Sequence, residues 1–195
     1  MTVVLSSVAM QPFAQVPINT FRQMFDSGAV FIDMEYDVTV PNTMVTGHSS
    51  ILIQGDMYHL QGDGLDVYNN GKSVWTVDES AREVVVESSA DVSEDYISNP
   101  VLLLSRMDDF FQVKSRKAAQ AHTEYVLQAT SDCGISQANL ILSADGKLIS
   151  GVFSLDDGNV LSIKVKSMKK TEEMPMASFS PKGKFGSDWI VTDLR

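Results

Sequence analysis

The sequence has only one cysteine, Cys133, and few basic residues. A single cysteine cannot form a disulfide within the chain, so the fold must depend on its apolar core. Lysine and arginine number 15 against 25 aspartate and glutamate residues, which gives a formal net charge of −10. Because a negative protein repels nucleic acid and anionic membrane surfaces, neither is expected as a partner. A run of about 18 apolar residues is also missing, so no membrane-spanning helix is predicted.

The composition is otherwise that of a globular protein. Hydrophobic residues make up 44% of the 195 residues, which excludes intrinsic disorder. A chain of this length can bury a sizeable core without a metal or disulfides. No repeat, low-complexity segment or long linker divides the sequence. We therefore expect one domain over residues 15–195.

The N-terminal residues 1–14 carry no charge and include a short apolar stretch. Ser7-Val8-Ala9 fits the small-x-small cleavage pattern of a secretory signal, and Ala14-Gln15 is a second candidate site. The basic region that opens such a signal is missing. We interpret residues 1–14 as the remnant of a secretory signal and expect an exported protein. An ordinary frayed apolar N-terminus is the alternative.

Hydrophobic periodicity changes early in the chain. Apolar residues at spacings of three and four over residues 18–25 predict a short helix, which Gly28 can end. From Val30 the period becomes two, which is typical of a strand with one apolar and one wet face. Acidic residues occupy the odd positions Asp33 to Asp37. The predicted inward-facing side chains are those of Ile32, Met34, Tyr36 and Val38.

Most of the remaining chain alternates short strand patterns with turn residues. Asn70-Gly71, Asp145-Gly146 and Asp157-Gly158 are typical hairpin turns. About ten or eleven antiparallel strands are expected, with three short helical interruptions, and a last short strand is possible over 189–192. So many hairpins predict a mainly β (α+β) fold. A single curved sheet or a barrel is expected, and the short helices could cover the concave face of an incomplete barrel.

A second helix is predicted near the middle of the chain. Asn99-Pro100 combines a capping side chain with a proline suited to the first helical turn. Apolar residues follow up to Met107, and the helix should end near Asp109. The adjacent acids Asp108 and Asp109 are interpreted as solvated charges.

The residue types that carry catalysis do not cluster in the sequence. His48, His59 and His122 have no metal-ligand spacing. Cys133 could act as a nucleophile only with a histidine nearby in space, and His122 is the one plausible base. No catalytic site, metal or cofactor is therefore expected. The 10 methionines and 9 phenylalanines fit either core packing or a surface for apolar ligands.

Several motifs together resemble the periplasmic outer-membrane lipoprotein carriers, the LolA-like family. They occur in the family's order over most of residues 17–195. The motifs are Met57–Leu60 (aromatic-x-aromatic strand), Asn70–Trp75 (DGK-x-x-W hairpin), Asn99–Leu104 (leucine-rich helix), Asp145–Leu148 (late hairpin) and Phe179–Pro181 followed by Gly183 (C-terminal Phe-x-Pro element).

The resemblance implies an incomplete antiparallel barrel with helices over its open side, and a carrier without a reaction to catalyse. An apolar cavity would receive the acyl chains of lipoproteins that cross the periplasm from the inner to the outer membrane. The implied partners are an inner-membrane lipoprotein-releasing ABC transporter and an outer-membrane acceptor or the outer membrane itself, and the protein would be a monomer. The implied cavity residues are Ile32, Met34, Tyr36, Val38, Tyr58, Leu60 and Trp75. The implied lid helix contains Pro100, Leu102, Leu103, Leu104 and Met107.

Two positions depart from the family pattern. Gln54-Gly55 stands where members commonly have Arg-Pro, and the resemblance implies that this arginine closes the lid by hydrogen bonds to backbone carbonyls. Gln54 is therefore the expected lid-closing position, with neutral hydrogen bonds only. Leu60 stands where the family often has tryptophan.

Two other functions stay open at the level of the sequence. One is a secreted β-rich module that recognises protein or glycan and has a filled core. The other is a hydrolase that would need His122 and Cys133 in contact.

Overall fold

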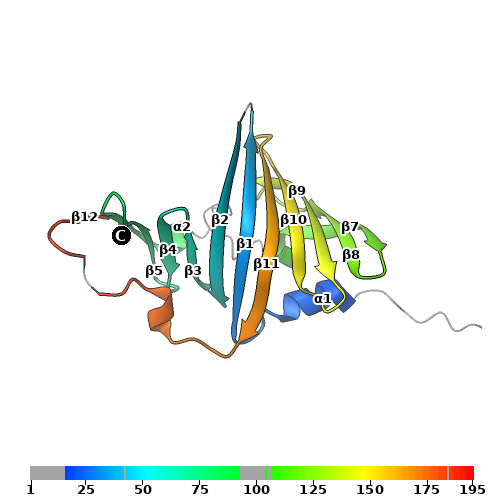
Figure 1. The fold of residues 1–195 in the computed structure, drawn as a ribbon, viewed down its shortest axis with the longest axis horizontal. Coiled ribbons are helices and arrows are strands. Elements are labelled where there is room, and N and C mark those ends of the chain that lie inside the picture. The colour runs from blue at the N-terminus through cyan, green and yellow to red at the C-terminus, as the bar shows by residue number, and fades with distance from the viewer. Residues whose placement is uncertain (1–15, 42, 93–103, 105–106, 184) are drawn as a thin grey trace, which may run out of the picture.

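The computed structural model describes residues 16–41, 43–92, 104, 107–183 and 185–195. Twelve strands in these ranges form one sheet (Figure 1). They are β1 (Ala29–Val40), β2 (Thr43–Gln54), β3 (Met57–Gly62), β4 (Leu65–Asn69), β5 (Ser73–Asp78), β6 (Glu83–Ser88), β7 (Phe111–Ala118), β8 (His122–Ala129), β9 (Ile135–Ser143), β10 (Leu148–Leu155), β11 (Val160–Thr171) and β12 (Ile190–Asp193). The described helical elements are α1 (Val16–Gln23), α2 (Ser89–Val92), α4 (Met107–Phe110) and the 3₁₀ turn η1 (Met176–Phe179).

The strand order is β12-β6-β5-β4-β3-β2-β1-β11-β10-β9-β8-β7. Successive hairpins build both halves, and the antiparallel pair β1–β11 joins them in the middle. The short strand β12 adds to the edge by pairing parallel with β6. The described sheet thus has twelve strands, more than the ten or eleven expected, and one pair is parallel.

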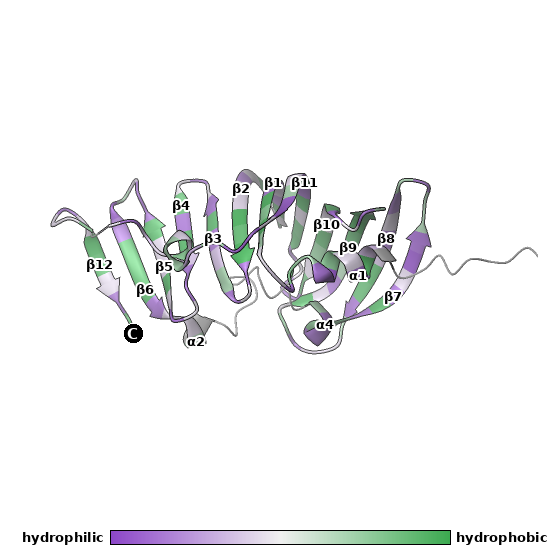
Figure 2. Ribbon diagram, turned by 90° about the horizontal axis from the view of Figure 1, so that it is seen from below, coloured by the Kyte–Doolittle hydropathy of each residue, from purple (hydrophilic) through white to green (hydrophobic). Residues whose placement is uncertain are grey.

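The sheet does not close on itself. Its edge strands, β12 and β7, lie at opposite ends of the molecule (Figure 2). This arrangement confirms the mainly β, open-barrel fold expected from the hairpin pattern. No helix in the described part of the chain is long and apolar enough to cross a membrane.

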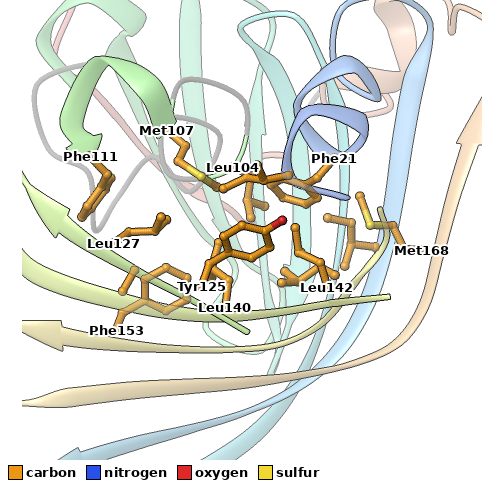
Figure 3. Packing of buried hydrophobic residues seen from close by; sticks show 14 of the residues in the cluster. Phe21, Leu104, Met107, Phe111, Tyr125, Leu127, Leu140, Leu142, Phe153 and Met168 are labelled. Atoms are coloured by element: carbon orange, nitrogen blue, oxygen red, sulfur yellow. The ribbon is translucent and has the colours of Figure 1, made fainter. Parts of the chain in front are cut away.

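Helices α1 and α4 lie on the same side of the sheet (Figure 3). We call this side the helix-covered face; it carries Ile32, Ile51 and Leu140, which belong to the main hydrophobic core. The other side is called the opposite face. Because side chains alternate along a strand, each strand contributes to both faces.

The predicted helix over residues 18–25 matches α1, which ends at Gln23. Ile18 and Phe21 are buried against the sheet. The turn between β9 and β10 approaches α1 so closely that a Cβ atom on Gly146 would lie 2.6 Å from the Cβ of Thr20. Gly146 also has a positive φ of 80°. Glycine is therefore needed here both for the turn and for helix packing.

The first strand has the predicted orientation. Ile32 and Met34 are buried, whereas Glu35 is exposed. Tyr36 and Val38, further along the same face, are half-buried. Because an unpaired carboxylate is costly to bury, the alternation of apolar and acidic residues determines which face of β1 is buried.

Candidate functional site

The helix-covered face holds the largest apolar cluster of the described residues (Figure 3). Phe21 from α1 and Met107 from α4 pack onto side chains of the strands. Tyr125, Leu127 and Leu140 are three of these strand residues, each at most 2% exposed. The cluster is therefore an apolar layer between a curved sheet and short helices.

Most of the predicted cavity residues belong to this layer. Ile32 and Tyr58 are fully buried, and Met34 is 8% exposed. Leu60 is half-buried and packs against the cluster, because it lies opposite Ile51 of β2. Burial raises the pKa of the Tyr58 phenol to about 12, so this side chain is neutral over the physiological range.

Tyr36 lies nearer the end of the long β1–β2 hairpin. Its ring crosses Gly47 on β2 so closely that an added Cβ would overlap the ring. Its hydroxyl donates a hydrogen bond to the carboxylate of Asp63, in the β3–β4 turn. This hydrogen bond raises the pKa of Tyr36. Tyr36 thus ties the hairpin to the next turn as well as lining the helix-covered face.

An apolar row crosses the sheet at Val38. Val38 is opposite Val45 on one side and Leu161 on the other, and Leu161 is opposite Phe153. Exposure falls along this row, from 52% at Val45 to 4% at Phe153. The row is a continuous apolar strip from solvent to the buried cluster.

One of the predicted cavity residues, Trp75, lies on the other face of the sheet. It is opposite Tyr68, whereas Leu60 is opposite Val67, the preceding residue of β4. Since neighbouring residues of a strand point to different faces, Trp75 and Leu60 lie on different faces. Trp75 instead packs in a second cluster with Val77 and Trp189. Trp75 therefore lies outside the apolar layer, and its inclusion among the implied cavity residues was wrong.

Gln54 also has a different partner from the one expected. Its Nε2 donates to the carbonyl oxygen of Met174 at 3.3 Å, and its Oε1 accepts from the N–H of Met174 at 2.7 Å. It follows Ile53, which is buried in the cluster under the helices, so Gln54 faces the other way. The described hydrogen bonds of Gln54 therefore anchor the segment after β11, on the face away from α1 and α4.

The predicted lid helix is described in part. Leu104 and Met107 are 6% and 3% exposed and pack in the cluster. Pro100, Leu102 and Leu103 lie outside the described residues. Asp108 was interpreted as a solvated charge, but its carboxylate forms an ion pair with Arg22 of α1. The two covering helices are thus joined to each other as well as to the sheet.

Tyr125 is a site residue that the sequence reasoning did not identify. Its side chain lies in the middle of the cluster, and its hydroxyl points toward Phe21 and Leu104 (Figure 3). Among the described residues, this hydroxyl has no hydrogen-bond partner. Leaving a buried hydroxyl unpaired is unfavourable. The only available signal was the period of two in this strand, which places Tyr125 on the same face as Thr123 and Leu127.

Cys133 and His122 do not meet. The Cys133 thiol is buried and donates to the carbonyl of Ile135 at 3.4 Å, and burial raises its pKa. His122 is at the other end of the β8–β9 hairpin, opposite Ser143. The condition for a cysteine hydrolase is therefore not met, because a nucleophile needs its base within hydrogen-bond reach.

Several solved structures are similar to this chain. An uncharacterized conserved protein from Thermus thermophilus superposes with a TM-score of 0.57 at 13% identity, covering 90% of this chain and 95% of that one. A LolA superfamily protein from Nitrosomonas europaea gives a TM-score of 0.46 at 13% identity, covering 86% and 99%. An outer membrane lipoprotein-sorting protein domain from Vibrio parahaemolyticus, described as putative, gives 0.44 at 10% identity, covering 84% and 95%.

The sequence comparisons are more specific. No curated protein sequence matches this chain. The family model of the outer membrane lipoprotein carrier protein LolA matches residues 63–182, which is more than half of the chain. The match includes β4 to β11 and therefore much of the layer described above. The protein belongs to the LolA family of outer membrane lipoprotein carriers.

Proposed function

We propose that this protein is a periplasmic carrier that binds the acyl chains of lipoproteins between its sheet and the covering helices. The observation that carries the proposal is the apolar layer on the helix-covered face, closed by α1 and α4. Family membership supports it. The predicted cavity residues Ile32, Met34, Tyr36, Val38, Tyr58 and Leu60 remain in this proposal, together with Leu104 and Met107.

A carrier of this kind addresses a simple energetic problem. Each methylene that leaves hydrocarbon for water costs about 0.8 kcal/mol, so an acyl chain crosses water only when it is covered. The side chains of the apolar layer would replace hydrocarbon contacts. The membrane already covers the acyl chain equally well, so the carrier can bind it only with moderate strength. Loading of the carrier therefore needs an energy source outside this protein.

Ligand entry would require the covering helices to move. The described side chains of the layer are closely packed, with Phe21 and Leu127 at 0% and 1% exposed. An acyl chain would take the place of side chains such as Leu104 and Met107. Helix α4 has only four residues and its ion pair with α1 involves a half-exposed carboxylate. Local opening of such an element costs less than unfolding of the sheet.

The apolar row that crosses the sheet through Val45, Val38, Leu161 and Phe153 offers the acyl chain a path. Its outer member is half-exposed and its inner member is buried. An incoming chain could exchange water for apolar contacts step by step along Val38 and Leu161. We extend the proposal to transfer from an inner-membrane ABC transporter to an outer-membrane acceptor, with the carrier acting as a monomer.

Native mass spectrometry of protein purified without detergent tests the proposal, with a fluorescent fatty acid as a second probe. We expect bound lipid, and competition between lipid and the fluorescent probe. Leu104→Glu should weaken probe binding. Val152→Glu is the matched control, because Val152 is 37% exposed and is next to Phe153 but on the other face. Absence of both lipid and probe binding, or equal loss in the two variants, would contradict the proposal.

A further inference from the structure

A pocket lies on the opposite face, between the sheet and the C-terminal segment. Its volume is about 600 Å³, which is within the usual range for small-molecule sites. Strands β3, β4 and β5 contribute its floor, and residues 174–182 together with Phe185 and Trp189 contribute its roof. Its polar and aromatic lining includes His59, Gln61, Asp66, Tyr68, Glu79, Lys182, Phe185 and Trp189. We call it the opposite-face pocket.

The floor of this pocket is ordered by contacts between strands. His59 and Tyr68 are opposite each other on β3 and β4, and their rings stack with centroids 4.1 Å apart. His59 Nε2 also lies 3.1 Å from a carboxylate oxygen of Asp66. Asp66 is only 9% exposed. The floor therefore holds an aromatic surface next to a buried carboxylate.

The roof is held in place on both sides of the pocket. Asn70 donates from Nδ2 to the Ser180 hydroxyl at 3.3 Å. Arg82 pairs with Asp188 at 2.6 Å. Phe185 lies between these two anchors in the sequence and Trp189 directly follows the second one; their rings lie 5.0 Å apart and are tilted by 48°. A pocket with a fixed floor and roof needs little reorganisation to bind a ligand.

The lining excludes some classes of ligand. Asp66 and Glu79 repel anions. Among the described side chains, only the His59 ring bonds to the Asp66 carboxylate. A hydrocarbon in the pocket would offer this carboxylate no further donor, and it is costly to bury an acceptor whose hydrogen bonds are not made. A simple cation is disfavoured by Lys182, which lines the same space.

The remaining chemistry fits a neutral polyhydroxyl molecule. Gln61 and Lys182 supply donors, whereas Asp66 and Glu79 supply acceptors. A sugar hydroxyl can both donate and accept, and the C–H face of a sugar ring packs on aromatic rings. We infer that the opposite-face pocket binds a carbohydrate of one or two rings. This site is separate from the acyl-binding layer, because the two lie on different faces of the sheet.

Saturation-transfer NMR and calorimetry test this inference on the full chain. The probes are glucose, galactose, N-acetylglucosamine and their disaccharides, with choline and free lysine as cationic probes. We expect at least one sugar to bind. Trp189→Ala should weaken that sugar by about tenfold or more, since an aromatic contact is lost, and Trp189→Phe should restore much of the affinity. Asp66→Asn should also weaken it.

Two controls keep the outcome clear. Thermal unfolding shows whether each variant is folded. Val38→Glu, on the helix-covered face, should impair acyl-probe binding and leave sugar binding unchanged. The inference is overturned if no sugar binds, if only choline or lysine binds, or if folded Trp189→Ala and Asp66→Asn bind sugar as the unaltered chain does.

Discussion

The guanidinium group of Arg22 pairs with the carboxylate of Asp108 and thereby joins α1 to α4. These two helices cover the apolar layer that the chain presents on one face of its sheet. The contact is polar and near the surface, since the Asp108 side chain is 56% exposed. It can therefore hold the helices together without making their separation prohibitive.

Asp108→Asn should loosen this contact. An exposed ion pair contributes only about 0–1 kcal/mol, so release of a bound acyl probe should accelerate by up to about fivefold, with little change in thermal stability. Stopped-flow fluorescence measures the release. High salt should accelerate release from the unaltered chain in the same way. Glu35→Gln removes a similarly exposed ion pair with Lys166 on the opposite face and should have no effect; equal acceleration in both variants would contradict this role.

Tyr125→Phe should leave the free protein as stable or make it more stable. The substitution removes a buried hydroxyl that has no partner among the described residues, and removing such a group is neutral or favourable. Tyr58→Phe is the comparison, because the Tyr58 hydroxyl bonds to the Asn69 side chain. It should lower the free energy of unfolding by about 1 kcal/mol. Urea titrations measure both; a clear loss of stability in Tyr125→Phe would reveal a partner.

Gln54→Ala should free the segment after β11. Two hydrogen bonds to Met174 are lost, which should cost about 1–3 kcal/mol locally. Hydrogen exchange should become faster around Met174 and remain unchanged in α1. Gln54→Glu keeps the acceptor and loses the donor, so an intermediate effect is expected. Faster hydrogen exchange in α1 instead would mean that Gln54 stabilises the helix-covered face, which would contradict its anchoring role.

Gly47→Ala should displace the ring of Tyr36. The new methyl group would overlap the present ring position, far inside contact distance. The ring must move, and its hydrogen bond to Asp63 would break. We expect a loss of more than about 1 kcal/mol in the unaltered background. In a Tyr36→Ala background the loss should be smaller, which a double-mutant cycle of urea titrations measures. An equal loss in both backgrounds would mean that Tyr36 is not the obstacle.

Local patterns were sufficient for much of the fold. The alternation of Ile32 and Met34 with acids predicted the buried face of β1, and the spacing of Ile18 and Phe21 predicted α1. These patterns are informative because the cost of burying a polar side chain selects an apolar residue at each buried position. The order of hairpins likewise predicted an open sheet, since each turn pairs strands that are adjacent in the chain.

Contacts between distant parts of the chain could not be predicted in this way. Trp75 is apolar and can cover either face of a strand, so only its register with Tyr68 decided its side. The partner of Gln54 is Met174, 120 residues further on. The ion pair of Asp108 joins two helices that no local signal connects.

The sequence by itself determined the strand-rich composition, the apolar face of the first strand and the family motifs, because these depend on spacing within a few residues. Tertiary structure decided which side of the sheet each aromatic side chain covers, where the C-terminal segment docks and which groups are left unpaired. Those outcomes depend on register and on three-dimensional proximity. A shift of one residue in register exchanges the two faces of a strand.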